Sequence, residues 1–105
     1  MTTPYRILYE ARQDVLEAEA RLEGEHPGYG VAFTDEFIVA VRSVLDQPRM
    51  YSRTEDGPRS VETREYFIQR FEYRVIYAID TEEIVFFAVY HARSRPGGWR
   101  RRLAQ

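Results

Sequence analysis

The segment Phe71–His91, FEYRVIYAIDTEEIVFFAVYH, most constrains the fold of this 105-residue chain. Two apolar runs, rich in β-branched and aromatic residues, flank the polar tetrapeptide Asp80–Glu83. This pattern predicts two antiparallel strands, Tyr73–Ile79 and Ile84–Tyr90, joined by a tight connection. The second run is apolar on both faces, which indicates a central strand that is covered at least in part on each side.

Upstream of this hairpin, apolar residues recur with helical spacing in two stretches. The first, Ala11–Leu22, places an apolar stripe opposite a charged face, and we expect its acidic residues from Asp14 to Glu25 to be solvated. The second, Val31–Asp46, carries a wider apolar stripe and is followed by Pro48, which cannot continue a helix. Glycine and proline in residues 24–28 separate the two stretches, so we expect a helical hairpin whose apolar faces need a sheet to cover.

A short β-prone run, Tyr5–Tyr9, precedes the helices, and a further strand candidate, Val61–Ile68, follows a long exposed loop at 47–60. The predicted order is therefore β-α-α-β-β-β. This is an α+β fold with a helical hairpin packed on one face of a small, mostly antiparallel sheet. We expect one domain, 1–105, with a basic tail at about 92–105. The opposite face of the sheet would stay partly open, with Arg74 projecting onto it.

Composition excludes several classes of site. The chain has no cysteine, so it has no disulfide framework and no thiolate ligand or nucleophile. Its two histidines, His26 and His91, lie far apart in sequence, and we expect no metal site. No stretch approaches the length of a membrane span, and the first residues lack the apolar core of a signal peptide, so we expect a cytoplasmic protein without membrane contact.

The charges are unevenly distributed. The net charge of −2 disfavours nucleic-acid binding by the chain as a whole. Residues 1–46 carry nine acids and four arginines, a balance of −5, whereas residues 47–105 carry eight acids and eleven arginines, a balance of +3. All basic residues are arginines. Guanidinium groups suit phosphate and carboxylate recognition, but a bias in genomic base composition explains the absence of lysine equally well.

In element order, length and local sequence, the chain resembles the RelE/ParE superfamily of bacterial type II toxins. The similarity rests on the helical hairpin that ends at Pro48, on Arg64, on the YRVIY segment Tyr73–Tyr77, and on the last strand with residues 91–96 and Trp99 after it. It covers nearly the whole chain. The resemblance implies a toxin that arrests growth and is encoded beside a small antitoxin with a DNA-binding N-terminus, which neutralises it. It implies no cofactor.

Two activities occur on this fold, and the fold cannot decide between them. ParE-like members poison DNA gyrase and lack the full nuclease set, whereas RelE-like members cleave messenger RNA on the ribosome. The gyrase alternative is slightly favoured, because the chain has an acidic helical hairpin, lacks the lysines of one nuclease branch and offers no obvious general base. A degenerate, non-toxic binding module is a third alternative. Whether the chain is an enzyme therefore stays open.

The nuclease alternative assigns specific residues. Metal-free RNA cleavage needs a base for the 2′-hydroxyl, cations for the phosphate and an acid for the leaving oxygen. By resemblance, Arg74 matches a phosphate-binding arginine, and His91 and Tyr90 lie near the position of a general acid. Further phosphate or target contacts are expected from Arg64, Arg93 and Arg95. Glu55 or Asp56 would serve as the base only if the long loop folds over the open face.

Each of these residues also has a structural alternative. Arg74 would pair with an acid on a neighbouring strand, such as Glu62 or Glu83, and His91 would end its strand bonded to the backbone. Trp99 is expected to dock the tail onto the sheet or helices rather than to stack on a base. Tyr90 would be half-buried packing and residues 100–102 a solvated end. We expect the antitoxin to lie across the exposed sheet and hairpin.

Overall fold

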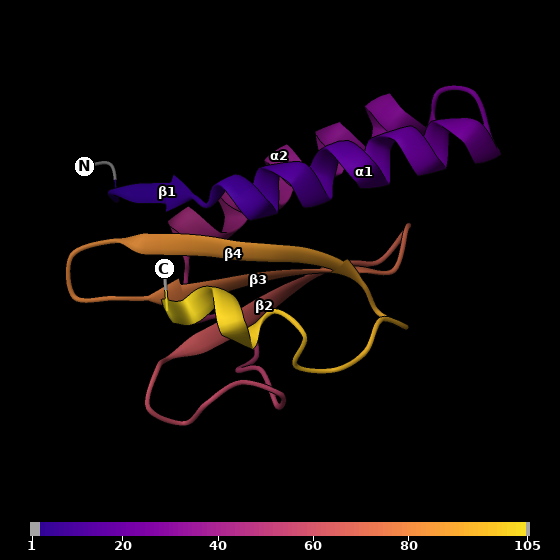
Figure 1. Ribbon diagram of the computed structural model, residues 1–105. Helices are drawn as coiled ribbons and strands as arrows, with labels where there is room; N and C mark the ends of the chain where they lie inside the picture. Colours follow the sequence, from indigo (N-terminus) through magenta and orange to yellow (C-terminus); the bar gives the residue numbers. More distant parts are fainter. Residues whose placement is uncertain (1–2, 105) are drawn as a thin grey trace.

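Four strands form one sheet in the order β1-β4-β3-β2, and two helices cover one of its faces in the computed structural model, which describes residues 3–104 (Figure 1). The elements are β1 (Tyr5–Ile7), α1 (Tyr9–Glu25), α2 (Tyr29–Asp46), β2 (Thr63–Ile68), β3 (Tyr73–Ile79), β4 (Ile84–His91) and the 3₁₀ helix η1 (Arg100–Ala104). β1 runs parallel to β4, and the other pairs are antiparallel. The predicted element order and α+β fold are therefore confirmed. Within the described part of the chain, no helix is both long and apolar enough to cross a membrane.

The first strand and the first helix meet without a loop. Tyr9, predicted to end the strand, is instead the first residue of α1. The backbone N–H of Leu8 donates to the carbonyl of Phe86 at 3.0 Å, which extends the β1–β4 pairing. The carbonyl of the same Leu8 accepts the N–H of Arg12 at 3.1 Å, which is the first turn of the helix. One residue thus belongs to both hydrogen-bond patterns, and the predicted boundary is two residues late.

Glu23 stabilises the turn between α1 and α2. Its carboxylate accepts the backbone N–H of Gly28 at 3.0 Å and that of Gly30 at 3.0 Å, and these bonds lower the pKa of Glu23. They satisfy free N–H groups at the start of α2, where an anion is favourable. Gly28 takes a φ of 93°, which glycine adopts readily. The helix α1 ends at Glu25, within the predicted stop at residues 24–28, so Gly24 stays inside α1 and Gly28 caps the start of α2.

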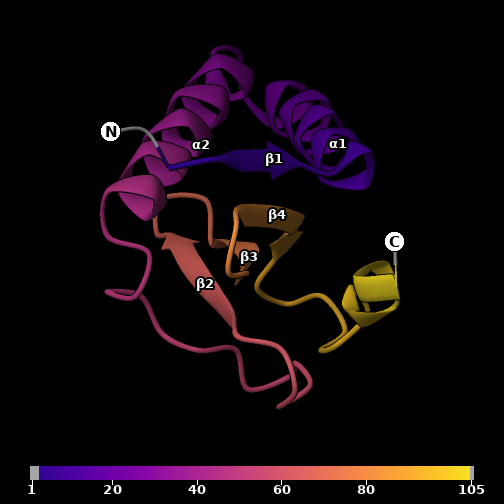
Figure 2. The same ribbon diagram turned by 90° about the vertical axis from the view of Figure 1, so that its left-hand side faces the viewer.

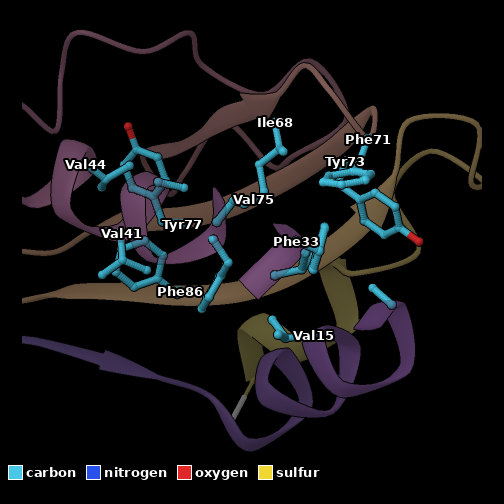
Figure 3. Close-up of a cluster of buried hydrophobic side chains, with 14 of the residues drawn as sticks. Val15, Phe33, Val41, Val44, Ile68, Phe71, Tyr73, Val75, Tyr77 and Phe86 are labelled. Carbon is cyan, nitrogen blue, oxygen red and sulfur yellow. The ribbon is translucent and has the colours of Figure 1, made fainter. Parts of the chain in front are cut away.

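The main core fills the space between the helices and the sheet. Alternation along β3 points Tyr73, Val75 and Tyr77 to this side, where Figure 3 shows them facing Phe33 and Val41 of α2. The buried hydroxyl of Tyr77 donates to the carbonyl of Pro48 at 2.6 Å. A buried polar group of this kind is tolerated because it has its partner, and the bond holds the end of α2 to the sheet.

The opposite face carries a second core, so it is not open at its centre. Apolar residues of β3 and β4 pack there against Trp99 and the start of α1; the cluster comprises Leu8, Ala11, Ile76, Ala78, Val85, Phe87, Ala88 and Trp99. Trp99 is 0% exposed. Figure 2 shows η1 beside the sheet and apart from α2. The prediction that Trp99 docks the tail is confirmed, whereas the prediction of an open face is wrong at the centre of the sheet, where the tail covers it.

Replacing Trp99 by alanine should lower the free energy of unfolding by about 3–5 kcal/mol, because it empties a fully buried site. Urea unfolding followed by far-UV circular dichroism measures this loss. Tyr9→Ala is the control, because Tyr9 is 71% exposed. It should lower the free energy of unfolding by less than about 0.5 kcal/mol. Equal losses for the two variants would contradict the docking of the tail.

Candidate functional site

Arg74 lies on the face of β3 turned away from the helices, as its alternation predicts. It is in register with Phe67 of β2 and Tyr90 of β4. Its side chain is only 16% exposed. The predicted face is therefore correct, but the prediction of a freely displayed guanidinium is wrong, because two carboxylates hold the group.

Asp56 and Glu65 form this clamp. Asp56 binds both terminal nitrogens of Arg74, with Nη1–Oδ2 at 3.0 Å and Nη2–Oδ1 at 2.8 Å. Glu65 binds Nε at 3.1 Å and Nη2 at 2.9 Å. The hydrogen bonds to Asp56, and then those to Glu65, raise the pKa of Arg74, so its charge is permanent.

The predicted partners of Arg74 bind elsewhere. Glu62 pairs with Arg49 and Arg64, and Glu83 pairs with Arg6. Glu65 takes their place because it lies on the same sheet face as Arg74, two positions from the residue directly opposite it. Diagonal neighbours of this kind are within reach of long side chains.

Asp56 joins three separate segments of the chain. Besides Arg74, its Oδ2 accepts the backbone N–H of Gly97 at 2.8 Å and the indole N–H of Trp99 at 3.1 Å. The bond from Arg74 is the main cause that lowers the pKa of Asp56 far below its usual range, against the opposing effect of burial. The long loop does fold over the face, as a general base would require. Asp56 itself is a permanently ionised and fully engaged carboxylate, which makes it a poor proton acceptor.

A shallow hollow of about 530 Å³ opens beside Arg74. Its lining residues are Ser52, Arg53, Glu55, Asp56, Glu65, Arg74, Ala92 and Pro96. The carboxylates outnumber the guanidinium groups in this lining, three to two. A phosphate placed here would meet an excess of negative charge, so the hollow does not form an anion site in this conformation.

Arg64 and His91 lie on the other face of the sheet. Arg64 is in register with Tyr77, and His91 with Tyr73, both of which point to the helices. Arg64 donates to Glu62 at 2.9 Å and to the carbonyl of Tyr51 at 2.6 Å. Its side chain is largely buried, and it anchors the start of the long loop.

His91 occupies the end of β4 as its structural alternative predicts. Its Nδ1 accepts the backbone N–H of Arg93 at 3.1 Å. Its ring packs edge-on against the ring of Tyr73, with the two ring centres 5.3 Å apart. It borders a hollow of about 460 Å³ between α1 and the end of β4. Its role as a general acid stays a prediction.

Tyr90 shares the face of Arg74 and lies beneath a second guanidinium. The Arg102 group stands 5.1 Å from the centre of the Tyr90 ring. Burial raises the pKa of Tyr90, so its hydroxyl stays protonated at neutral pH. Arg93 and Arg95, the remaining predicted contacts, are exposed on the segment after β4. The six predicted residues are thus divided between two faces and the tail.

Within residues 3–104, no group of three histidine, aspartate or glutamate side chains is placed to hold a metal ion.

The ion pair between Asp14 and Arg102 was not predicted from the sequence. Asp14 binds Arg102 with Nη1–Oδ2 at 2.7 Å and Nη2–Oδ1 at 3.2 Å, and it accepts the backbone N–H of Val89 at 2.9 Å. Arg102 also donates to the carbonyl of Phe87 at 2.9 Å. Both side chains are largely buried. The predictions that Asp14 belongs to a solvated helix face and Arg102 to a solvated end are therefore wrong.

Replacing Asp56 by asparagine should lower the free energy of unfolding by about 2–4 kcal/mol at neutral pH, because Arg74 then loses one of its two anions in a partly buried site. The folded-state pKa of Asp56 is lowered, so its carboxylate stabilises the fold above the ordinary carboxyl pKa, and this contribution is lost as the pH falls below it.

The difference between wild type and Asp56→Asn should accordingly shrink between about pH 5 and pH 3. Urea midpoints across this range measure it. Asp35→Asn changes an exposed carboxylate of α2 and is the control. A gap that does not vary with pH, or a similar loss in the control, would argue against the clamp.

Comparison with known proteins gives a family and a fold. Residues 5–96 match the family described as "ParE toxin of type II toxin-antitoxin system, parDE". A solved structure described as "Chromosomal ParDE TA system from P. aeruginosa" is similar with a TM-score of 0.73 and 10% sequence identity, over 88% of this chain and 98% of that chain. At this identity the likeness shows the fold alone. No curated protein sequence matches this chain.

Proposed function

Since the chain belongs to the ParE toxin family of type II toxin–antitoxin systems, we propose that it arrests growth by binding DNA gyrase rather than by cleaving RNA. The main support for this proposal is that two carboxylates already bind the guanidinium group of Arg74. The resemblance assigns that guanidinium to the scissile phosphate in a ribonuclease of this fold, where a cation must stabilise the developing charge. Here Asp56 and Glu65 occupy all the nitrogens that would face a substrate.

The division of the remaining residues supports the same conclusion. Tyr90 shares a face with Arg74, whereas Arg64 and His91 lie on the helix side of the sheet. A phosphodiester bound on either face would meet only part of the set, and a catalytic group must lie within hydrogen-bond reach of the atoms that react. A toxin that acts by binding its target needs no such convergence.

A cognate antitoxin is the second expected partner, and the helical hairpin is its expected docking surface. Tyr9, Leu16 and Ile38 are exposed apolar residues of the two helices. A groove of about 340 Å³ between the helices is lined mainly by apolar side chains, among them Leu16 and Phe37. Exposed apolar patches of this kind mark interaction sites. The sheet face was also expected to be part of this surface, but the tail covers its centre. The hairpin is therefore the remaining docking surface.

The purified toxin should inhibit supercoiling of relaxed plasmid by DNA gyrase and should trap a cleavage complex, seen as linear DNA after detergent and protease treatment. The His91→Ala variant should inhibit as strongly as wild type, because this proposal gives His91 no chemical role. Toxin that is first mixed with its antitoxin is the control and should be inactive.

Unchanged supercoiling with no trapped DNA would contradict the gyrase proposal. New 5′ ends within codons, found by primer extension and lost in His91→Ala, would point to the ribonuclease alternative. Normal growth during expression without antitoxin would point to a non-toxic binding module.

Leu16→Glu should weaken antitoxin binding by about tenfold or more, because it places a carboxylate in the apolar groove, and burial of an unpaired charge is costly. Co-purification and calorimetric titration of the two proteins measure the effect. Val31→Glu likewise replaces an exposed apolar residue by glutamate, but near the start of α2 and outside the residues that line the groove, and it should bind normally. Equal affinity for both variants would place the antitoxin elsewhere.

A further inference from the structure

The segment after β4 presents arginines that are not used by the fold. Arg93, Arg95, Arg100 and Arg101 are all exposed, and from Ile84 onward the sequence contains no acidic residue. Within residues 3–104, none of these four side chains makes an ion pair or a hydrogen bond to another described side chain or backbone group. They differ in this from Arg102, which Asp14 and the carbonyl of Phe87 hold against the sheet.

This basic segment, residues 92–103, is fixed to the domain at several points. At its start, the backbone N–H of Ala92 donates to the backbone carbonyl of Glu72 at 2.8 Å. In its middle, Gly97 and Trp99 are bound by Asp56. At its end, Arg102 is bound by Asp14. The four arginines therefore stand on an ordered support, which lowers the entropic cost of binding a ligand with them.

The rest of the surface of the basic segment consists of small residues. Its other exposed residues are Ala92, Ser94, Pro96 and Gly98. The large exposed apolar side chains lie on other elements, such as Leu16 on α1 and Phe67 on β2. Protein interfaces are centred on buried aromatic or aliphatic anchors, which this segment lacks. A phosphate backbone needs only guanidinium charge and hydrogen-bond donors.

We propose that the basic segment binds the phosphate backbone of duplex DNA without reading its sequence. The helices carry most of the negative charge of residues 1–46, so the bound duplex lies away from them. Two acids contact this segment directly, but Asp56 is paired with Arg74 and Asp14 with Arg102. Glu17 lines the same hollow as Arg93 and Ser94. This inference goes beyond the proposed gyrase target, since it concerns DNA itself and holds in the absence of any other protein.

Fluorescence anisotropy of a labelled duplex of about 20 base pairs, titrated with the full chain, tests the proposal. The dissociation constant should lie at about 10⁻⁴–10⁻⁶ M near physiological salt, and four phosphate contacts give a slope of log K against log salt of about −3.6. Removing two contacts in Arg100→Gln/Arg101→Gln or in Arg93→Gln/Arg95→Gln should reduce the slope to about −1.8.

Arg12→Gln/Arg42→Gln is the matched control, because it makes the same change in net charge at exposed positions on the two helices. Its slope and affinity should equal those of wild type. The fluorescence of Trp99, the only tryptophan, shows whether the tail of each variant remains docked.

No binding of the duplex at low salt would overturn the proposal. So would an equal loss of affinity in the control and in a tail variant whose Trp99 fluorescence shows that its tail is still docked. Polyglutamate bound as tightly as DNA would also overturn it and would assign the segment to an acidic protein. The assay contains no gyrase, so a negative result in the supercoiling test leaves its outcome unaffected.

Discussion

The ion pair between Asp56 and Arg74 organises the half of the molecule that faces away from the helices. One carboxylate binds the long loop, β3 and the tail to each other, with four hydrogen bonds to Arg74, Gly97 and Trp99. Because ion pairs out of water lose much of their hydration, their presence is weak evidence of added stability. Their geometry, however, admits one arrangement of the three segments. We therefore regard this pair as a device that sets conformation.

This arrangement separates two surfaces with different chemistry. On one side, the helical hairpin exposes apolar residues around a groove and carries acidic side chains. On the other side, the tail exposes arginines on a support that depends on Trp99. A toxin of the ParE family needs a partner that silences it and a target that it poisons. The two surfaces are distinct enough for the molecule to meet partners of different kinds through different faces.

The fold was largely predictable because periodicity is a local signal. Apolar stripes located both helices, and two apolar runs located the β3–β4 hairpin. The site was much less predictable, because it depends on register. β4 has one extra residue, Phe87, opposite the β3 pair Ile76–Tyr77. This bulge reverses the alternation, so that Tyr90 falls on the side of Arg74 and His91 on the other.

Long-range ion pairs were also out of reach of sequence reasoning. Asp14 and Arg102 are 88 positions apart, and Asp56 and Arg74 are 18 apart. Each residue looks like part of an ordinary charged stretch, and no spacing rule connects it to its partner. Alternation correctly assigned Arg74 to a face of β3, but it carried no information about which loop would cover that face.

The two ends of the described chain both depend on β4. β1 pairs with one of its edges through Tyr5 and Ile84, and the tail packs on one of its faces through Trp99. The pairing of β1 with β4 closes a very large loop, as does the packing of Trp99 near Leu8 and Ala11 in the second core. Loop closure slows folding when contacts are distant in sequence. The β3–β4 hairpin is local and forms its contacts early by comparison. It therefore provides the template on which the first strand and the tail assemble, and the second core is completed last.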